Sequence, residues 1–144
     1  MRIDLPRIKR YLMEITKNAN DLRQLIEENE LKPDSTALKA AKYILVELAE
    51  AMSNTIQHIL AKQQGIAVSG YIDTIAKAHQ QAIISAELFR KLKPFFDFRK
   101  SLIHRYWRID DRRLIQNIRI GQGDFLQFVE EIEEYLTSLR REES

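Results

Sequence analysis

Very few residues in this sequence interrupt helices. Four glycines and three prolines are spread over 144 residues, whereas a fold of many short strands needs frequent turn residues. Apolar residues instead recur every three or four positions, which is the period of one buried face of an α-helix. Near the N-terminus this pattern puts six apolar residues on one face: Ile8, Leu12, Ile15, Ala19, Leu22 and Ile26. The sequence therefore predicts an all-α fold, an antiparallel bundle of four to five helices with short connections.

Capping and breaking residues divide the chain into segments. Helices are expected over about residues 4–28, 36–63, 71–78, 85–107, 110–119 and from 125 towards the end. Pro94 is expected to kink or break its helix near Lys93, because proline lacks an N–H donor and crowds the preceding turn. We treat 1–144 as a single domain, with an N-terminal helix and loop over 1–34 and a core bundle over 36–141.

Composition excludes several kinds of site. The chain has no cysteine, so disulfides and thiolate metal sites are excluded and a reducing cytoplasm is compatible. No apolar run approaches the roughly 20 residues that a membrane-spanning helix needs. The three histidines are not at metal-ligand spacing. We therefore expect a cytoplasmic protein with no metal site, no cofactor and no membrane segment.

Positive charge is concentrated in one part of the chain. Residues 90–119 contain ten basic and three acidic side chains, so this segment carries +7 and the remainder −5 of a total of +2. A local positive field of this kind favours a polyanionic partner, RNA or DNA. The alternative is that the segment is an ordinary solvated helix face.

The centre of the basic segment carries residues suited to cutting RNA. Arg99, His104 and Tyr106 follow one another in the stretch FFDFRKSLIHRYWRIDDRR, which also holds Trp107. A histidine can take the proton of a ribose 2′-hydroxyl or protonate the leaving oxygen, and a guanidinium stabilises the charge that develops on the phosphate. This chemistry needs no metal and selects RNA over DNA.

The spacing of Arg99 and His104 restricts how they could act together. Five residues apart on a helix, they lie roughly 140° apart around the axis. Two copies of the motif facing each other across a symmetric dimer would close this gap. Arg and His at this separation also occur by chance in many helical proteins, and Tyr106 and Trp107 are more often packing residues than base-stacking platforms.

A second polar line runs along the helix expected over residues 36–63. Glu47, Asn54 and His58 are separated by seven and four residues, which keeps them on one side of the helix beside the apolar stripe. One interpretation is that they face a cleft shared with Arg99 and His104. The other is that they are ordinary polar residues at the edge of the core.

The stretch FRKSLIHRYWRIDD resembles the signature of HepT-like toxins, members of the HEPN superfamily of helical ribonucleases. The matching positions are Phe98, Arg99, Lys100, Leu102, Ile103, His104, Arg105, Tyr106, Trp107, Ile109 and Asp110. The stretch VELAEAMSNTIQHILA resembles the second-helix pattern of the same family, with Glu47, Asn54 and His58 at matching intervals. The resemblance covers about residues 42–139, and the first forty residues fit only as an extra N-terminal helix.

This resemblance implies an α-helical homodimer whose composite cleft cuts RNA without metal, leaving 2′,3′-cyclic phosphate ends on tRNA or mRNA. It implies the toxin of a type II or type VII toxin–antitoxin pair, with Arg99 and His104 catalytic. The partner would be a nucleotidyltransferase antitoxin that can join the toxin in a hetero-oligomer and transfer AMP onto Tyr106. Phosphate and bulk there would repel RNA from the cationic cleft. The RNA backbone would be held by basic residues, namely Lys100, Arg105, Arg108, Arg112 and Arg113.

Two positions depart from the family pattern. Lys100 stands where the family usually has Asn, and Asn54 stands where the family usually has an acidic residue. Both changes add positive character, which could tighten RNA binding or weaken the enzyme. Two alternatives therefore stay open: a catalytically silent helical module that binds RNA or nucleotide, and a structural partner that docks onto a nucleotidyltransferase.

Overall fold

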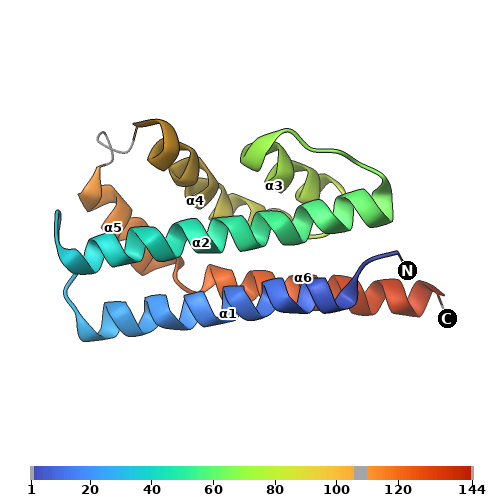
Figure 1. Cartoon of the computed structure of the whole chain (residues 1–144), viewed down its shortest axis with the longest axis horizontal. Coiled ribbons are helices and arrows are strands. Elements are labelled where there is room, and N and C mark those ends of the chain that lie inside the picture. The colour runs from blue at the N-terminus through green and yellow to red at the C-terminus, as the bar shows by residue number, and fades with distance from the viewer. Residues whose placement is uncertain (1, 106–109, 144) are drawn as a thin grey trace.

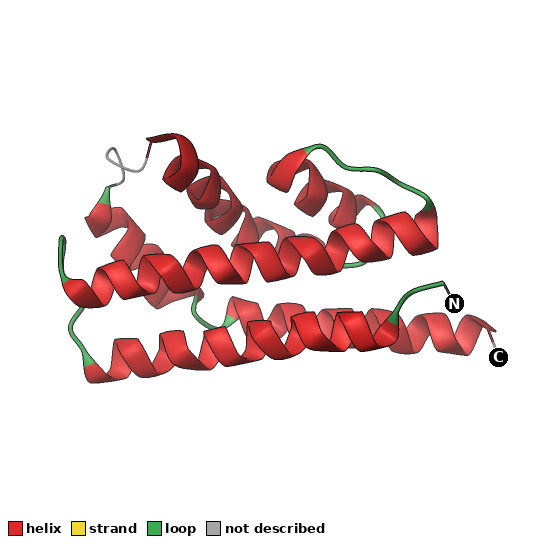
Figure 2. Cartoon of the chain, viewed as in Figure 1, coloured by secondary structure: helices red, strands yellow, loops and turns green. Residues whose placement is uncertain are grey.

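The computed structural model describes residues 2–105 and 110–143, with side chains as far as Arg99 in the first of these stretches. Six α-helices and one π-helical turn make up this part of the chain, and it contains no strand (Figure 2). They are α1 (Leu5–Glu28), α2 (Thr36–Ile59), η1 (Leu60–Gln64), α3 (Gly70–Gln80), α4 (Ala86–Arg105), α5 (Asp111–Gly121) and α6 (Asp124–Glu143). The all-α prediction is confirmed. The helix count exceeds four or five because α3 and α5 are short additions to four long helices.

Short polar side chains set the starts of four helices. Asp4 caps α1 by accepting from the Arg7 N–H at 3.1 Å. Ser35 caps α2, Ser85 lies at the start of α4 with its hydroxyl accepting a backbone N–H, and Asp110 caps α5. Such side chains satisfy backbone N–H groups that have no partner within the helix. This is why the helix starts could be predicted from the sequence.

The long helices enclose one hydrophobic core. In Figure 1, α1 and α2 run antiparallel along the molecule, α6 lies beside α1, and α4 crosses obliquely behind α2. Helix α3 packs against α2 and α4. Fully buried side chains come from α1, α2, α4 and α6, among them Ile15, Met52, Phe96, Phe125 and Phe128. A continuous core of this kind fixes the relative positions of α2, α3 and α4, which carry the candidate site.

A kink or a break was predicted near Lys93. Helix α4 runs through Pro94 without a break, so the predicted break is wrong. Pro94 is exposed, and so is Arg90, whose carbonyl would have accepted the missing N–H. Water can satisfy that carbonyl. The opposite face of the same turns is buried through Leu92, Phe95 and Phe96. Packing of this face outweighs the cost of one lost hydrogen bond, because tertiary contacts supply most of a helix's stability.

Helix α2 ends earlier than predicted. It passes at Leu60 into the π-helical turn η1. Gly65, with φ of +66°, closes that turn in the left-handed conformation that glycine adopts without strain. The loop that follows leads back to α3, and Gly70 begins that helix with φ of +86°. This return places α3 beside α4.

Candidate active site

Helix α4 carries the first two residues of the proposed motif. Arg99 and His104 both belong to its last turns, so one continuous helix separates them by about 7.5 Å along its axis. The side chains of Lys100, His104 and Arg105 lie outside the described residues, and so do Tyr106 and Arg108 altogether. The geometry of the site is therefore built on Arg99.

Arg99 is buried although it is charged. Its exposed fraction is only 8%. One guanidinium nitrogen, Nη2, donates to Oε1 of Glu50 on α2 at 3.2 Å. The central guanidinium carbon, Cζ, lies 4.6 Å from the centre of the Tyr71 ring on α3. An ion pair and a cation–π contact from two different helices thus hold this cation.

Tyr71 and Glu50 are also joined to each other. The Tyr71 hydroxyl donates to Oε1 of Glu50 at 3.4 Å, the same oxygen that accepts from Arg99. Burial raises the pKa of Tyr71; Arg99 opposes this change and Glu50 adds to it. The phenol therefore stays protonated and able to donate. We call Glu50, Tyr71 and Arg99 the arginine cluster.

The arginine cluster leaves hydrogen-bonding capacity unused. Nε and Nη1 of Arg99 are buried and donate to no acceptor in the part of the chain that the structure describes. Buried guanidinium groups normally have their N–H donors satisfied. Unpaired donors on a cation favour an anionic oxygen, and a phosphate supplies several. Both donors are out of contact with solvent in this conformation, so a phosphate could reach them only if the surrounding side chains moved.

The polar residues of α2 do not act as one group. Glu47 is half-buried and Asn54 is exposed, and Glu50 lies between them on the same side of the helix. His58 is buried, and its Nε2 accepts from the backbone N–H of Asp4 at 2.9 Å. The structure thus directs His58 to the N-terminal segment and does not bring it to Arg99.

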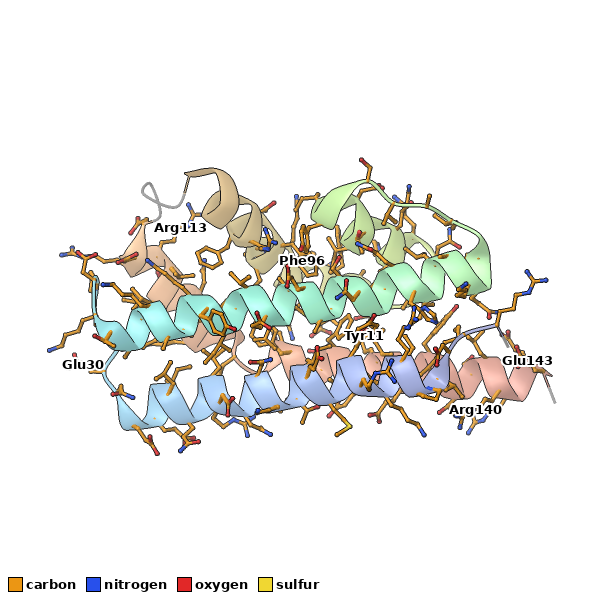
Figure 3. The ribbon with its side chains drawn as sticks, in the orientation of Figure 1. Tyr11, Glu30, Phe96, Arg113, Arg140 and Glu143 are labelled. Carbon is orange, nitrogen blue, oxygen red and sulfur yellow. The ribbon has the colours of Figure 1, made fainter. Side chains whose placement is uncertain are left out.

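The start of α5 presents basic side chains next to the end of α4. Arg112 and Arg113 are exposed, while their backbone N–H groups donate to the Asp110 cap. Arg113 lies close to the C-terminal end of α4 in Figure 3. Asp111 fixes this start, because its carboxylate accepts from Lys42 Nζ at 2.9 Å and from the Asp34 N–H at 3.0 Å. Arg112 and Arg113 therefore project from an anchored turn.

The sequence matches the family model described as "Ribonuclease HepT-like" over residues 5–132. The chain belongs to the HepT-like family. The match begins in α1, so the N-terminal helix is part of the family fold. The expectation that the first forty residues fit only as an extra N-terminal helix is therefore wrong. No functionally curated protein is similar enough in sequence to count as a match.

Solved structures share the fold of this HepT-like chain. A Bacillus subtilis cytosolic protein of unknown function, YutE, is 17% identical, with a TM-score of 0.80 over 95% of this chain and 93% of that one. A tri-AMPylated HEPN toxin of Shewanella oneidensis, in complex with an MNT antitoxin, is 21% identical, with a TM-score of 0.80 over 89% and 97%. A mutant MntA-HpeT toxin–antitoxin complex gives 20% identity and a TM-score of 0.78 over 89% and 98%.

Two members of the arginine cluster were missed by sequence reasoning. Glu50 shares a helix face with Glu47, and periodicity cannot tell which carboxylate meets Arg99. Tyr71 sits in a short helix after a loop, with no motif around it.

Among the described side chains, no group of three or more His, Cys, Asp or Glu is arranged to hold a metal ion. No helix in the described part of this HepT-like chain is long and apolar enough to cross a membrane.

Proposed function

We propose that this chain is an endoribonuclease that cuts RNA without a metal ion and serves as the toxin of a toxin–antitoxin pair. One observation carries the proposal. Arg99, at the motif position for phosphate stabilisation, is a buried cation, and two of its N–H donors have no partner among the described residues. It lies on the same helix as His104, within a segment of net charge +7. Buried donors are normally paired, so these two support an anionic ligand at this position.

The reaction follows from the chemistry of the two residues. His104 takes the proton of the ribose 2′-hydroxyl, whose oxygen then attacks the adjacent phosphorus. Arg99 stabilises the negative charge of the five-coordinate phosphate. The 5′-oxygen of the next nucleotide leaves with its bonding electrons and takes a proton from a general acid. The products are a 2′,3′-cyclic phosphate and a 5′-hydroxyl.

A homodimer would complete the cleft. Arg99 and His104 are five positions apart on one helix, which sets their backbone positions about 140° apart around its axis, so a second copy is needed to bring both residues to one phosphate. A two-fold axis beside the end of α4 would bring the histidine of one copy opposite the arginine of the other. Sedimentation velocity tests the assembly, and a dimer is expected at micromolar concentration.

The proposed partner is a nucleotidyltransferase antitoxin. The Shewanella oneidensis HEPN toxin with a similar fold is tri-AMPylated and bound to an MNT antitoxin. In this chain Tyr106 would receive the AMP group. An adenylyl group next to the basic segment adds negative charge and bulk, which would repel RNA. Mass spectrometry of the chain after co-expression with its antitoxin would show an added AMP on the peptide that contains Tyr106.

Cleavage of a mixed tRNA and mRNA pool in EDTA tests the catalytic claim. Substituting His104→Ala or Arg99→Ala is expected to lower the rate by about 10²- to 10⁴-fold. His79→Ala is the matched control, since His79 stacks on Phe89 at 5.1 Å in another part of the chain. Cleavage that requires added metal, or that survives His104→Ala, would contradict the mechanism.

The burial of Arg99 under Glu50 favours one alternative, a module that binds RNA or nucleotide without cutting it. Lys100 in place of Asn and Asn54 in place of an acidic residue point the same way. If the wild-type protein binds RNA at low salt and never cuts it, this alternative replaces the enzyme. If it does not bind RNA either, a structural role beside the antitoxin is what remains.

A further inference from the structure

We propose that Tyr71 is a positioning residue for Arg99: its ring, together with the Glu50 carboxylate, fixes the guanidinium in the orientation that meets an RNA phosphate. The inference rests on the proposed function, since it assigns a role towards the same phosphate. It adds a residue on α3, a helix that carries no part of the Arg–His motif.

The two contacts on Arg99 are of different kinds and restrict different motions. Cζ of Arg99 lies over the Tyr71 ring, 4.6 Å from its centre. Glu50 binds Nη2, which lies 3.2 Å from Oε1. The ring restricts the position of the guanidinium carbon, and the carboxylate restricts rotation of the group about that carbon. Together they leave Nε and Nη1 as the donors without a partner among the described residues.

Glu50 needs Tyr71 in order to hold a fixed position. The Glu50 side chain is 47% exposed, and a carboxylate so close to water exchanges readily between orientations. The Tyr71 hydroxyl donates to the same Oε1 that accepts from Arg99. Tyr71, Glu50 and Arg99 thereby form a closed ring of three contacts from α3, α2 and α4. Removing the tyrosine releases both of the other members.

Tyr71 is itself well anchored. Its ring lies 6.3 Å from that of Phe96, tilted by 55°. Phe96 is fully buried in the core and precedes Arg99 by three residues, so both lie on the same side of α4. In Figure 3 the labelled Phe96 stands between α4 and α3, above α2. The first turn of α3 is closed by a hydrogen bond from the Ser69 N–H to Asp73 at 2.9 Å. The ring therefore presents a fixed surface to the cation.

Three variants separate the ring from the hydroxyl and from general packing. Tyr71→Leu removes the aromatic face and the hydroxyl. Tyr71→Phe keeps the face and removes only the hydroxyl. Phe89→Leu is the matched control, because Phe89 is a half-buried ring on α4 that stacks on His79 of α3 and makes no ring contact with Arg99. Circular dichroism and thermal unfolding establish that each variant is folded.

Two measurements on the full-length chain are compared across these variants. The first is steady-state cleavage of a single-stranded RNA. Tyr71→Leu is expected to lower kcat by about 10- to 100-fold with a smaller change in KM, since misplacing a catalytic group costs rate in this range. Tyr71→Phe is expected to restore most of kcat. The second is the Nε–Hε nuclear magnetic resonance signal of Arg99, which the ring current of Tyr71 should shift in the wild type and in Tyr71→Phe but not in Tyr71→Leu.

The outcomes decide the inference separately from the enzyme claim. If Tyr71→Leu cleaves as fast as Phe89→Leu, the positioning role is overturned, whatever the resonance does. If the wild type binds RNA without cleaving it, the enzyme claim fails and RNA affinity tests the positioning role. A loss of affinity of about fivefold or more in Tyr71→Leu alone supports that role, and equal affinities in Tyr71→Leu and Phe89→Leu overturn it. If the wild type neither cuts nor binds RNA, both claims fall.

A further variant covers the case in which Tyr71→Leu does not fold. Glu50→Gln keeps the side-chain shape and removes the charge that holds Nη2. Positioning predicts a lower kcat than in Glu14→Gln, which removes the same charge from an exposed position of α1. A higher kcat in Glu50→Gln than in Glu14→Gln would mean that Glu50 merely masks Arg99, and it would overturn the inference.

Discussion

The backbone N–H of Asp4 donates to Nε2 of His58 over 2.9 Å, although 54 positions separate them in the chain. This bond joins the cap of α1 to the last turn of α2. Asp4 uses its side chain to cap α1 and its N–H to reach His58. His58 is therefore a structural residue that ties the N-terminal segment to the bundle, which explains why it does not line the candidate active site.

Lowering the pH should weaken the hydrogen bond between the Asp4 N–H and His58. Burial lowers the pKa of His58 below its ordinary value of 6.5, Arg7 lowers it further, Asp4 opposes this and Lys62 adds a small decrease. Since the folded state favours the neutral imidazole, its contribution to stability is fully present above the unfolded pKa near 6.5 and is lost as pH falls through the lower folded pKa. A protonated Nε2 also cannot accept the Asp4 N–H.

The test is thermal unfolding at pH 7.5 and pH 5. The wild-type Tm is expected to fall more than that of His58→Gln, whose amide oxygen can accept the same bond without titrating. His58→Ala, which removes the acceptor of the Asp4 N–H, should cost about 0.5–1.5 kcal/mol at pH 7.5. Equal pH dependence in the wild type and in His58→Gln would show that another group is responsible.

Gly121 lies against a buried ring. A Cβ added there would come within 2.8 Å of Cζ of Phe95, which is buried and packs edge-on against Phe125 with ring centres 4.9 Å apart. The ring has no room to retreat, so Gly121→Ala should destabilise the fold by about 1–3 kcal/mol, the usual cost of overpacking. Gly123→Ala is the control, because nothing lies within 4 Å of its added Cβ. Chemical denaturation measures the free energy of unfolding of both variants. An equal loss in Gly121→Ala and Gly123→Ala would contradict the close contact.

Asp111 anchors the start of α5 to α2. Burial raises the pKa of its carboxyl, but the hydrogen bonds from Lys42 and Asp34 outweigh this, and the pKa lies below its ordinary value. Its contribution to stability is thus present above the unfolded pKa near 4 and is lost as pH falls through the folded pKa. Asp111→Asn should cost about 1 kcal/mol at pH 7, and the difference from the wild type should shrink below pH 4.

The neighbouring Asp110→Asn separates anchoring from helix capping. Asparagine caps helices as well as aspartate does, so this variant should unfold within about 0.5 kcal/mol of the wild type. Urea denaturation at pH 7 compares the two substitutions. If Asp110→Asn is the more harmful of the two, the ion pair of Asp111 with Lys42 contributes less than the charge at the cap.

Periodicity and capping chemistry were enough to predict most of the fold. The predicted stripe of α1 is buried at Ile8, Leu12, Ile15, Ala19 and Leu22, and its last member, Ile26, is half-buried. Such signals are local, since they depend on residues three or four positions apart. Pro94 shows their limit: its effect on α4 depended on which face of the helix was buried, and that is set by distant helices.

The candidate site likewise has one part that a local pattern predicts and another part that it does not. The Arg99 position follows from a local motif, and the structure places it at the centre of a polar cluster. Glu50 and Tyr71 reach it from other helices, at separations of 49 and 28 positions along the chain, and no local pattern marks them. The partner of His58 was also not predictable from a local pattern, because Asp4 is brought to it by the packing of α1 on α2.

The exposed Arg112 and Arg113 should set part of the salt dependence of RNA binding. Each cation that neutralises a phosphate of a single strand adds about −0.7 to the slope of log K against log salt concentration. The double substitution Arg112→Gln, Arg113→Gln should therefore make the slope shallower by about 1.4. Arg140→Gln with Arg141→Gln removes the same charge from the far end of the molecule, where Figure 3 shows Arg140 opposite Arg113. Fluorescence anisotropy with a labelled RNA measures both, and a similar change in the two double variants would indicate binding by overall charge without a defined basic surface.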